Sequence, residues 1–248
     1  VTDGYKTDLF LPVIAVLEEK SGKSYDDDED ARKAMRIVAD HIRTATMLIG
    51  DVNGILPSNV GAGYILRRLL RRAIRYARKL GLDSSALTAV SEIFIDKIYD
   101  EAYPLLVEKK YYILSEIAKE ADKFEATLAT GLKEFNKCID GIKRKNEFMS
   151  AKDPAYVPEN GINGKQAFRL YDTFGFPVEL TEELAAEVGF TVDKAGFDAA
   201  FKEHQEKSKQ LPQGAAKGGL TEQNEITDYT PPLTFSTPLL KAYLMTIP

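Results

Sequence analysis

Cysteine and histidine are scarce in this chain of 248 residues, which contains one cysteine, Cys138, and two histidines, His41 and His204. A single cysteine cannot form a disulfide within the chain. These residues are also too few for a usual structural zinc site, which needs four ligands. The scarcity therefore predicts a protein of a reduced, cytoplasmic compartment with no metal site of its own.

Long apolar runs and targeting signals are also lacking. The longest apolar stretch, from Leu9 to Leu17, is interrupted by Pro12 and is far shorter than the roughly 20 residues of a membrane-spanning helix. The chain starts with Val1-Thr2-Asp3, which is neither the basic nor the apolar segment of a signal peptide. We therefore expect no membrane partner, and the missing initiator methionine predicts a piece of a longer chain with further domains.

The composition is typical of a folded globular protein. Hydrophobic residues make up 44% of the chain and charged residues 29%, close to the average for soluble domains. The length fits one large domain or two small ones. A formal net charge of −5 by itself disfavours nucleic-acid binding, so the distribution of the charges has to decide that question.

Helical periodicity dominates the sequence, and strand-like alternation is scarce. We predict an all-α fold: a helical bundle with one long amphipathic helix at about 105–145, a second, smaller helical subdomain and a short irregular C-terminal tail. Glycines and prolines gather in residues 153–164 and again beyond residue 211, which predicts divisions at 1–152, 153–210 and 211–248. Further helices are expected at about 8–21, 31–49, 63–80, 85–101, 165–171, 178–188 and 194–209.

Two features that suggest ligand binding have simpler interpretations. The acidic run at 26–30 is followed by Ala31, where an EF-hand calcium loop requires glycine. Acids at the start of a helix interact favourably with its dipole, so this run predicts a helix N-terminus. His41 shares the apolar side of the next helix, which favours a buried core histidine over a ligand or a base.

One helix carries an unusual concentration of positive charge. In residues 66–80, LRRLLRRAIRYARKL, a helical wheel separates an apolar arc from a basic arc that contains no acid. Like charges four residues apart destabilise a helix, and guanidinium groups bind phosphate bidentately. The basic face therefore predicts an anionic partner. It consists of Arg67, Arg68, Arg71, Arg72, Arg75, Arg78 and Lys79.

Three interpretations of this basic face are open from the residues alone. It can bind nucleic-acid phosphates, pair with acids elsewhere in this acidic protein, or lie on an anionic membrane. Nucleic acid is favoured, because the apolar arc carries Leu, Ile and Ala rather than the aromatic residues of a typical membrane helix. The preceding turn, 56–63, can present backbone N–H groups and Asn59 to an anion or a base edge, although Asn59 is alternatively a helix cap.

Four segments stand in order along the chain: residues 39–43 (ADHIR), 56–59 (LPSN), 63–73 (GYILRRLLRRA) and 171–177 (YDTFGFP). Together they resemble alanyl-tRNA synthetases, and the resemblance covers roughly residues 5–209. It concerns the helical middle region that recognises the tRNA acceptor stem, since no segment resembles the aminoacylation core or the zinc-dependent editing domain. The resemblance implies that this fragment has no catalytic residue and no cofactor of its own. The full cytoplasmic enzyme would attach alanine to tRNA(Ala) with ATP, magnesium and zinc.

The resemblance also implies roles for two residues. The family reads a G·U wobble pair with the Asn of the Pro-Ser-Asn motif and the Asp of the Tyr-Asp motif, which correspond to Asn59 and Asp172. The minor groove of an RNA helix is open to side chains, and the guanine 2-amino group is a donor there. A carboxylate can only accept, whereas an amide can also donate. The basic face would then bind backbone phosphates of tRNA, not DNA, without reading sequence.

Alternatives and departures accompany these assignments. Asp172 is also a natural turn residue before Gly175. Val60 and Ala62 stand where the family often has Glu and Arg, so one of the family's contacts is expected to be missing. The alternative function is a helical protein-interaction module whose basic face docks an acidic partner.

Overall fold

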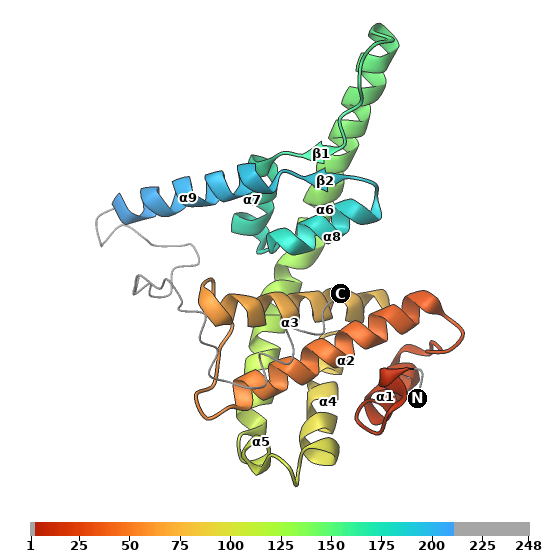
Figure 1. The fold of residues 1–248 in the computed structure, drawn as a ribbon, viewed down its shortest axis with the longest axis vertical. Helices are drawn as coiled ribbons and strands as arrows, with labels where there is room; N and C mark the ends of the chain where they lie inside the picture. The colour runs from red at the N-terminus through yellow and green to blue at the C-terminus, as the bar shows by residue number, and fades with distance from the viewer. Residues whose placement is uncertain (1–2, 211–248) are drawn as a thin grey trace. The chain divides into compact units, whose positions relative to one another are not determined.

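The computed structural model describes residues 3–210 of the chain, which are mostly helical. The predicted all-α fold with one long helix is confirmed, and the predicted tail at 211–248 lies outside the described residues. The helices are α1 (Leu11–Ser21), α2 (Glu29–Gly50), α3 (Gly61–Lys79), α4 (Ser85–Ile93), α5 (Pro104–Glu108), α6 (Lys110–Lys152), α7 (Gly164–Phe174), α8 (Val178–Glu187) and α9 (Lys194–Gln210), shown in Figure 1.

The acidic run begins α2, as predicted. The Asp28 carboxylate caps the helix by accepting a hydrogen bond from the Ala31 backbone N–H at 2.9 Å. Glu29 and Asp30 lie in the first turn, where their charges face the positive end of the helix dipole. The predicted helix N-terminus is therefore confirmed.

Helix α3 buries its apolar arc against α2, α4 and α6. Such burial stabilises by about 25 cal/mol per Å² of apolar surface removed from water, so this packing fixes the rotation of α3 and turns its basic face away from the core. Every apolar residue of the arc is buried, namely Leu66, Leu69, Leu70, Ala73, Ile74, Ala77 and Leu80.

The expected helix at 105–145 is instead two helices. Helix α5 ends at Glu108, and α6 then runs for 43 residues from Lys110 to Lys152. Along its length α6 packs against α2, α3, α4 and α5 and then against α7 (Figure 1). A Cβ at Gly131 would lie 2.3 Å from the Phe176 ring, so the glycine allows the 174–177 segment to press directly against α6.

The helix expected at 85–101 is also shorter than predicted, because α4 passes into a π-helical turn at Phe94–Ile98. Two strands, β1 (Gly161–Ile162) and β2 (Thr191–Val192), pair in parallel and lead into α7 and α9. Each strand has two residues, too few for an alternating pattern to show in the sequence.

Residues 1–204 form one compact unit, which contains the first expected helical subdomain and all of the second except residues 205–210. The division near residue 152 stays a prediction. Within residues 3–210, no helix combines the length and the apolar character needed to cross a membrane.

Candidate nucleic-acid interface

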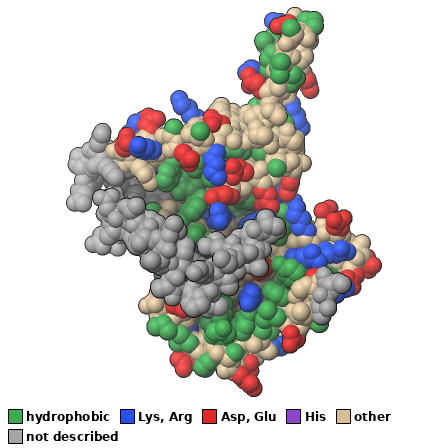
Figure 2. All heavy atoms as spheres, in the orientation of Figure 1, with side chains coloured by type: hydrophobic (Ala, Val, Ile, Leu, Met, Phe, Trp, Pro, Cys, Tyr) green, Lys and Arg blue, Asp and Glu red, His purple; other side chains and the backbone are tan. Residues whose placement is uncertain are grey.

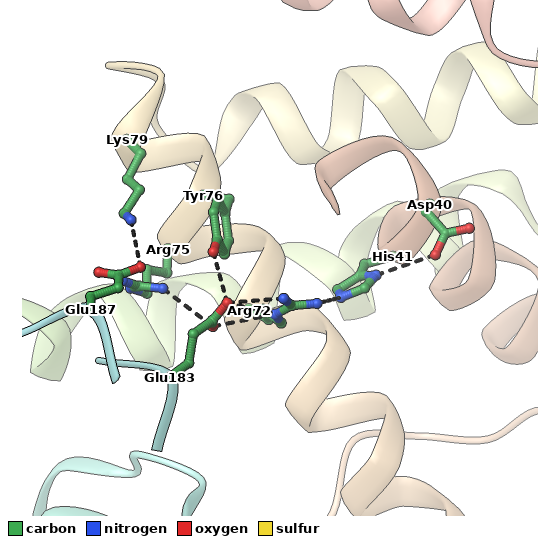
Figure 3. A network of polar contacts seen from close by, with 8 residues as sticks. All are labelled: Asp40, His41, Arg72, Arg75, Tyr76, Lys79, Glu183 and Glu187. Atoms are coloured by element: carbon green, nitrogen blue, oxygen red, sulfur yellow. Dashed lines mark hydrogen bonds and ion pairs between the residues drawn. The ribbon is translucent and has the colours of Figure 1, made fainter. Parts of the chain in front are cut away.

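The basic face of α3 meets a row of glutamates on α8 (Figure 3). Arg72 lies 2.9 Å from Glu183, and Arg75 lies 3.2 Å from Glu183 and 2.5 Å from Glu187. Lys79 continues the row with an ion pair to Glu187 at 2.8 Å. Residues three or four apart share a helix face, so the matched spacing on the two helices produces this ladder of ion pairs.

Hydrogen bonds within the ladder keep Glu183 ionised. Burial alone would raise the pKa of Glu183, but hydrogen bonds from Arg72 and Tyr76 hold it below its ordinary value. The Tyr76 hydroxyl donates to Glu183 at 2.7 Å, and burial together with this hydrogen bond raises the pKa of Tyr76 to about 12. Glu183 therefore carries its charge throughout the neutral range.

His41 ends the ladder on the α2 side, where it is buried as predicted. Its Nε2 lies 3.2 Å from an Arg72 nitrogen. Arginine can only donate, so Nε2 accepts and the imidazole proton sits on Nδ1, which faces the Asp40 carboxylate at 3.5 Å. Burial, reinforced by the charge of Arg72, lowers the pKa of His41. The side chain is thus a neutral, structural histidine.

In the first half of α3, one arginine pairs with a deeply buried carboxylate. Arg71 pairs with Glu120 of α6 at 2.7 Å and donates to the carbonyl of Gly175. Glu120 is only 3% exposed, and burial lowers the pKa of Arg71 against the opposing charge of Glu120. Arg68 pairs with Glu179 at the start of α8, at 2.9 Å. This half of α3 is therefore joined to both α6 and α8.

All seven residues of the basic face have a carboxylate partner within the protein. Internal pairing, one of the three interpretations of the sequence, therefore describes the geometry, and acids and bases are interspersed on the face shown in Figure 2. Four cations remain more than a third exposed, whereas three do not. The exposed side chains are Arg68 (36%), Arg72 (37%), Arg78 (52%) and Lys79 (44%), and the others are Arg67 (13%), Arg71 (11%) and Arg75 (5%).

Asn59 is exposed in the turn before α3 and is not the helix cap, because the N-cap residue is Val60. Arg67 donates one hydrogen bond to the Asn59 amide oxygen and another to the Pro57 carbonyl at 3.3 Å. Besides the oxygen that accepts from Arg67, the Asn59 amide has two N–H donors. The turn is compact, since a Cβ at Gly63 would lie 2.3 Å from the Ser58 hydroxyl.

Asp172 lies in the last turn of α7, with 48% of its side chain exposed. The helix then ends at Gly175 in the left-handed conformation, with φ +68°. A carboxylate at the C-terminal end of a helix faces the negative end of the dipole and costs about 0.3–1 kcal/mol. No basic residue stands in that turn to offset it.

Arginines link the two predicted reading residues to the same end of α3. Arg67, which holds Asn59, is close enough for its charge to act on Tyr171, although burial dominates and the pKa of Tyr171 is raised. Arg71 binds the carbonyl of Gly175, three residues after Asp172. The turn before α3 and the end of α7 are therefore connected through two guanidinium groups.

The acidic partners of the basic face were not identified from the sequence. A signal was present, because Glu179, Glu183 and Glu187 recur every four residues, as do Arg68 and Arg72. Such matched spacing predicts that two helices can align their charges. Glu120 gave no comparable signal. Among residues 3–210, no group of three His, Cys, Asp or Glu side chains is arranged to hold a metal.

Comparison with known proteins identifies the class of this chain. Residues 1–238 match the family described as tRNA synthetases class II (A), and the chain belongs to that family. Its relatives include the alanine–tRNA ligase of Borrelia hermsii, 44% identical over 218 residues, which are 88% of this chain and 34% of the relative.

Two further alanine–tRNA ligases give the same result. That of Treponema pallidum is 43% identical over 91% of this chain and 35% of the relative. That of Geobacillus kaustophilus is 38% identical over 92% of this chain and 25% of the relative. The chain thus spans about a third or less of the length of the curated relatives it matches.

Proposed function

We propose that this chain is the part of an alanine–tRNA ligase that recognises the acceptor stem of tRNA(Ala). In this proposal Asn59 and Asp172 read a G·U wobble pair. The observation that carries the proposal is the exposed carboxylate of Asp172 at the unfavourable end of α7, joined through Arg71 to the helix that follows Asn59. A charge that costs stability where it stands is readily explained by a ligand.

The two side chains offer complementary hydrogen-bonding chemistry. Asp172 accepts from the guanine 2-amino group, which has no base partner in a wobble pair. Asn59 can donate from its amide N–H groups while its oxygen accepts from Arg67, and the uracil O2 in the minor groove is an acceptor. The pair of residues therefore fits both edges of the base pair.

Phosphate contacts fall to the four cations that are more than a third exposed: Arg68, Arg72, Arg78 and Lys79. Exposed ion pairs contribute only about 0–1 kcal/mol, so phosphates can replace their carboxylate partners. Arg67, Arg71 and Arg75 instead support the site from within, since they are largely buried.

The full enzyme, in this proposal, attaches alanine to tRNA in the cytoplasm with ATP, magnesium and zinc held by other domains. The 248 residues alone are expected to bind RNA without catalysing a reaction. Alanine-dependent ATP–pyrophosphate exchange by the isolated chain would contradict this assignment.

The test is binding to acceptor-stem minihelices that differ only in a G·U or G·C pair. We expect about tenfold or greater preference for G·U, because a charge-assisted hydrogen bond contributes about 1.5–3 kcal/mol. Asp172→Asn and Asn59→Ala should each abolish most of the preference. Four phosphate contacts predict a slope of log K against log salt on the order of −3. Equal binding of both minihelices would refute the proposal.

The alternative is a protein-interaction module whose basic face docks an acidic partner. The ladder with α8 favours it to a degree, because it shows that the face accommodates a row of helical carboxylates. Weak RNA binding that is blind to the wobble pair and unchanged by Asp172→Asn would support this module instead.

A further inference from the structure

Asp172 has a basic neighbour at the end of α7. His204 of α9 places its Nε2 3.8 Å from a carboxylate oxygen of Asp172, and the two side chains are 51% and 48% exposed. This separation is too long for a hydrogen bond. Each group therefore keeps its hydrogen-bonding capacity for a ligand, and the two present a donor beside an acceptor.

Aromatic packing holds His204 in this place. Its ring packs on Phe168 with ring centroids 5.4 Å apart. Phe168 and Tyr171 of α7 in turn pack against Phe197 and Phe201 of α9, with centroid distances between 5.5 and 6.4 Å. Aromatic pairs of this kind add about 0.5–1.5 kcal/mol each beyond their buried area. The imidazole is thus positioned by a packed cluster that joins α7 to α9.

The juxtaposition matches one base edge. In the minor groove, guanine presents its 2-amino donor directly beside the ring nitrogen N3, which is an acceptor. Adenine has N3 without the amino group, and pyrimidines have O2 without a neighbouring donor. An acceptor and a donor held side by side therefore complement guanine better than any other base.

We infer that His204 is a further specificity-determining residue, which donates a hydrogen bond to N3 of the guanine whose 2-amino group is accepted by Asp172. This inference rests on the proposed function, since it requires the wobble pair to lie at Asp172. In this inference two side chains recognise the guanine, Asp172 from α7 and His204 from α9, in addition to the role of Asn59.

The experiment combines protein variants with single-atom changes in the RNA. Wild-type protein and His204→Phe are each titrated with minihelices that carry guanine, inosine or 3-deazaguanine opposite the uracil. Inosine lacks the 2-amino group, and 3-deazaguanine lacks the N3 acceptor. Phenylalanine keeps the packing on Phe168 but cannot donate.

For the wild type we expect inosine to weaken binding about tenfold or more and 3-deazaguanine to weaken it about fivefold, as a charge-assisted and a neutral hydrogen bond would. His204→Phe should bind the guanine minihelix about fivefold more weakly and lose all sensitivity to 3-deazaguanine. It should keep the inosine penalty and the salt slope of the wild type, which a merely structural defect would not do selectively.

Two control variants complete the design. His204→Gln retains a donor and should keep part of the 3-deazaguanine penalty, and Lys202→Ala removes a charge from the same helix and should keep all of it. Equal 3-deazaguanine penalties in wild type and His204→Phe would overturn the inference, as would a wild type that senses inosine but not 3-deazaguanine. A wild type that prefers neither G·U over G·C nor guanine over inosine would instead overturn the proposed function.

Discussion

Helix α3 contacts its neighbours through two interfaces of opposite character, an apolar joint and an ionic joint. Toward α2 it packs closely through a buried apolar arc, whereas toward α8 it is connected by long charged side chains. The apolar joint is favourable at any ionic strength. The ionic joint aligns the two helices through matched charges but is weakened by salt wherever it is exposed.

This contrast shows how one helix can be held firmly in the fold and still offer some of its cations to another anion. The apolar arc fixes the rotation of α3, and the deep pair between Arg71 and Glu120 connects it to α6. The outer ion pairs of the ladder, by contrast, involve cations that are about a third or more exposed, such as Arg72 and Lys79. Only the cations of these outer ion pairs can therefore exchange a carboxylate for another anion at a small cost in free energy.

The largest effect is expected in the apolar joint. Leu70 is fully buried, and Leu70→Ala should lower the free energy of unfolding by about 3–4 kcal/mol, through lost burial and the cavity left behind. Urea denaturation should give the same loss at low and high salt. A loss that shrinks markedly with salt would contradict the apolar character of this joint.

Next comes the buried ion pair. Glu120→Gln leaves Arg71 with a neutral acceptor in a site that is 3% exposed, so the free energy of unfolding should fall by about 2 kcal/mol. Chemical denaturation measures this change, and Glu147→Gln, the same substitution at an exposed position of α6, is the control that should be nearly neutral. Comparable losses in both variants would refute the special role of Glu120.

The outer ion pairs of the ladder should contribute less to the free energy of unfolding. Glu187→Gln removes the exposed pair with Lys79, while buried Arg75 keeps Glu183 as a charged partner, and we expect a loss of about 1 kcal/mol or less that diminishes in high salt. In RNA titrations the same variant should bind slightly more tightly, because a carboxylate that competes with phosphate has gone. Weaker RNA binding would argue against phosphate contacts at this part of α3.

Acid should weaken the ladder in two steps. Burial and Arg72 hold the pKa of His41 below 6.5 in the folded protein, so the unfolded chain binds a proton first as the pH falls. The stability contribution of neutral His41 is present above pH 6.5 and is lost below it. Glu183 and Glu187 have pKa values lowered below 4.5 by their cationic partners, against the effect of burial, so their contribution is lost only under more acid conditions.

Thermal denaturation across pH 7.5 to 3.5 tests this order. His41→Gln should remove the first step, because glutamine can accept the hydrogen bond from Arg72 without titrating, and should leave the second step in place. A variant that retains the full loss near pH 6 would show that another group is responsible.

The smallest effect is expected at Asp172, and with the opposite sign. Asp172→Asn removes a charge that opposes the dipole of α7, so the free energy of unfolding should rise by about 0.3 kcal/mol or slightly more. The same substitution should abolish the preference for the G·U minihelix. A destabilised variant would mean that Asp172 serves the fold and not a ligand.

The sequence predicted the helices better than it predicted the side-chain contacts between them. The arc from Leu66 to Leu80 and the acidic cap of α2 follow from periodicity and dipole chemistry, which are local properties. The role of Glu120 could not be predicted, because the contact joins residues 49 positions apart and depends on tertiary packing. The break before Lys110 was not predicted either, because no glycine or proline marks it in the sequence.

The candidate site was predicted in part. The resemblance predicts Asn59 and Asp172 as the reading residues, and both are exposed in the structure; their role stays a prediction. The hydrogen bond from Arg67 that orients the amide of Asn59, and the approach of His204 to Asp172, required three-dimensional geometry. No spacing rule connects the end of one helix with a residue 32 positions later on another.

The contact between Gly131 and Phe176 couples α6 to the 174–177 segment, which joins α7 to α8. Any side chain at position 131 would push against that ring and displace the segment that begins α8 and follows Asp172. A change on α6 would then shift the start of α8 relative to the end of α7, which carries Asp172. The missing side chain at position 131 thus sets how closely α6 and the 174–177 segment approach one another.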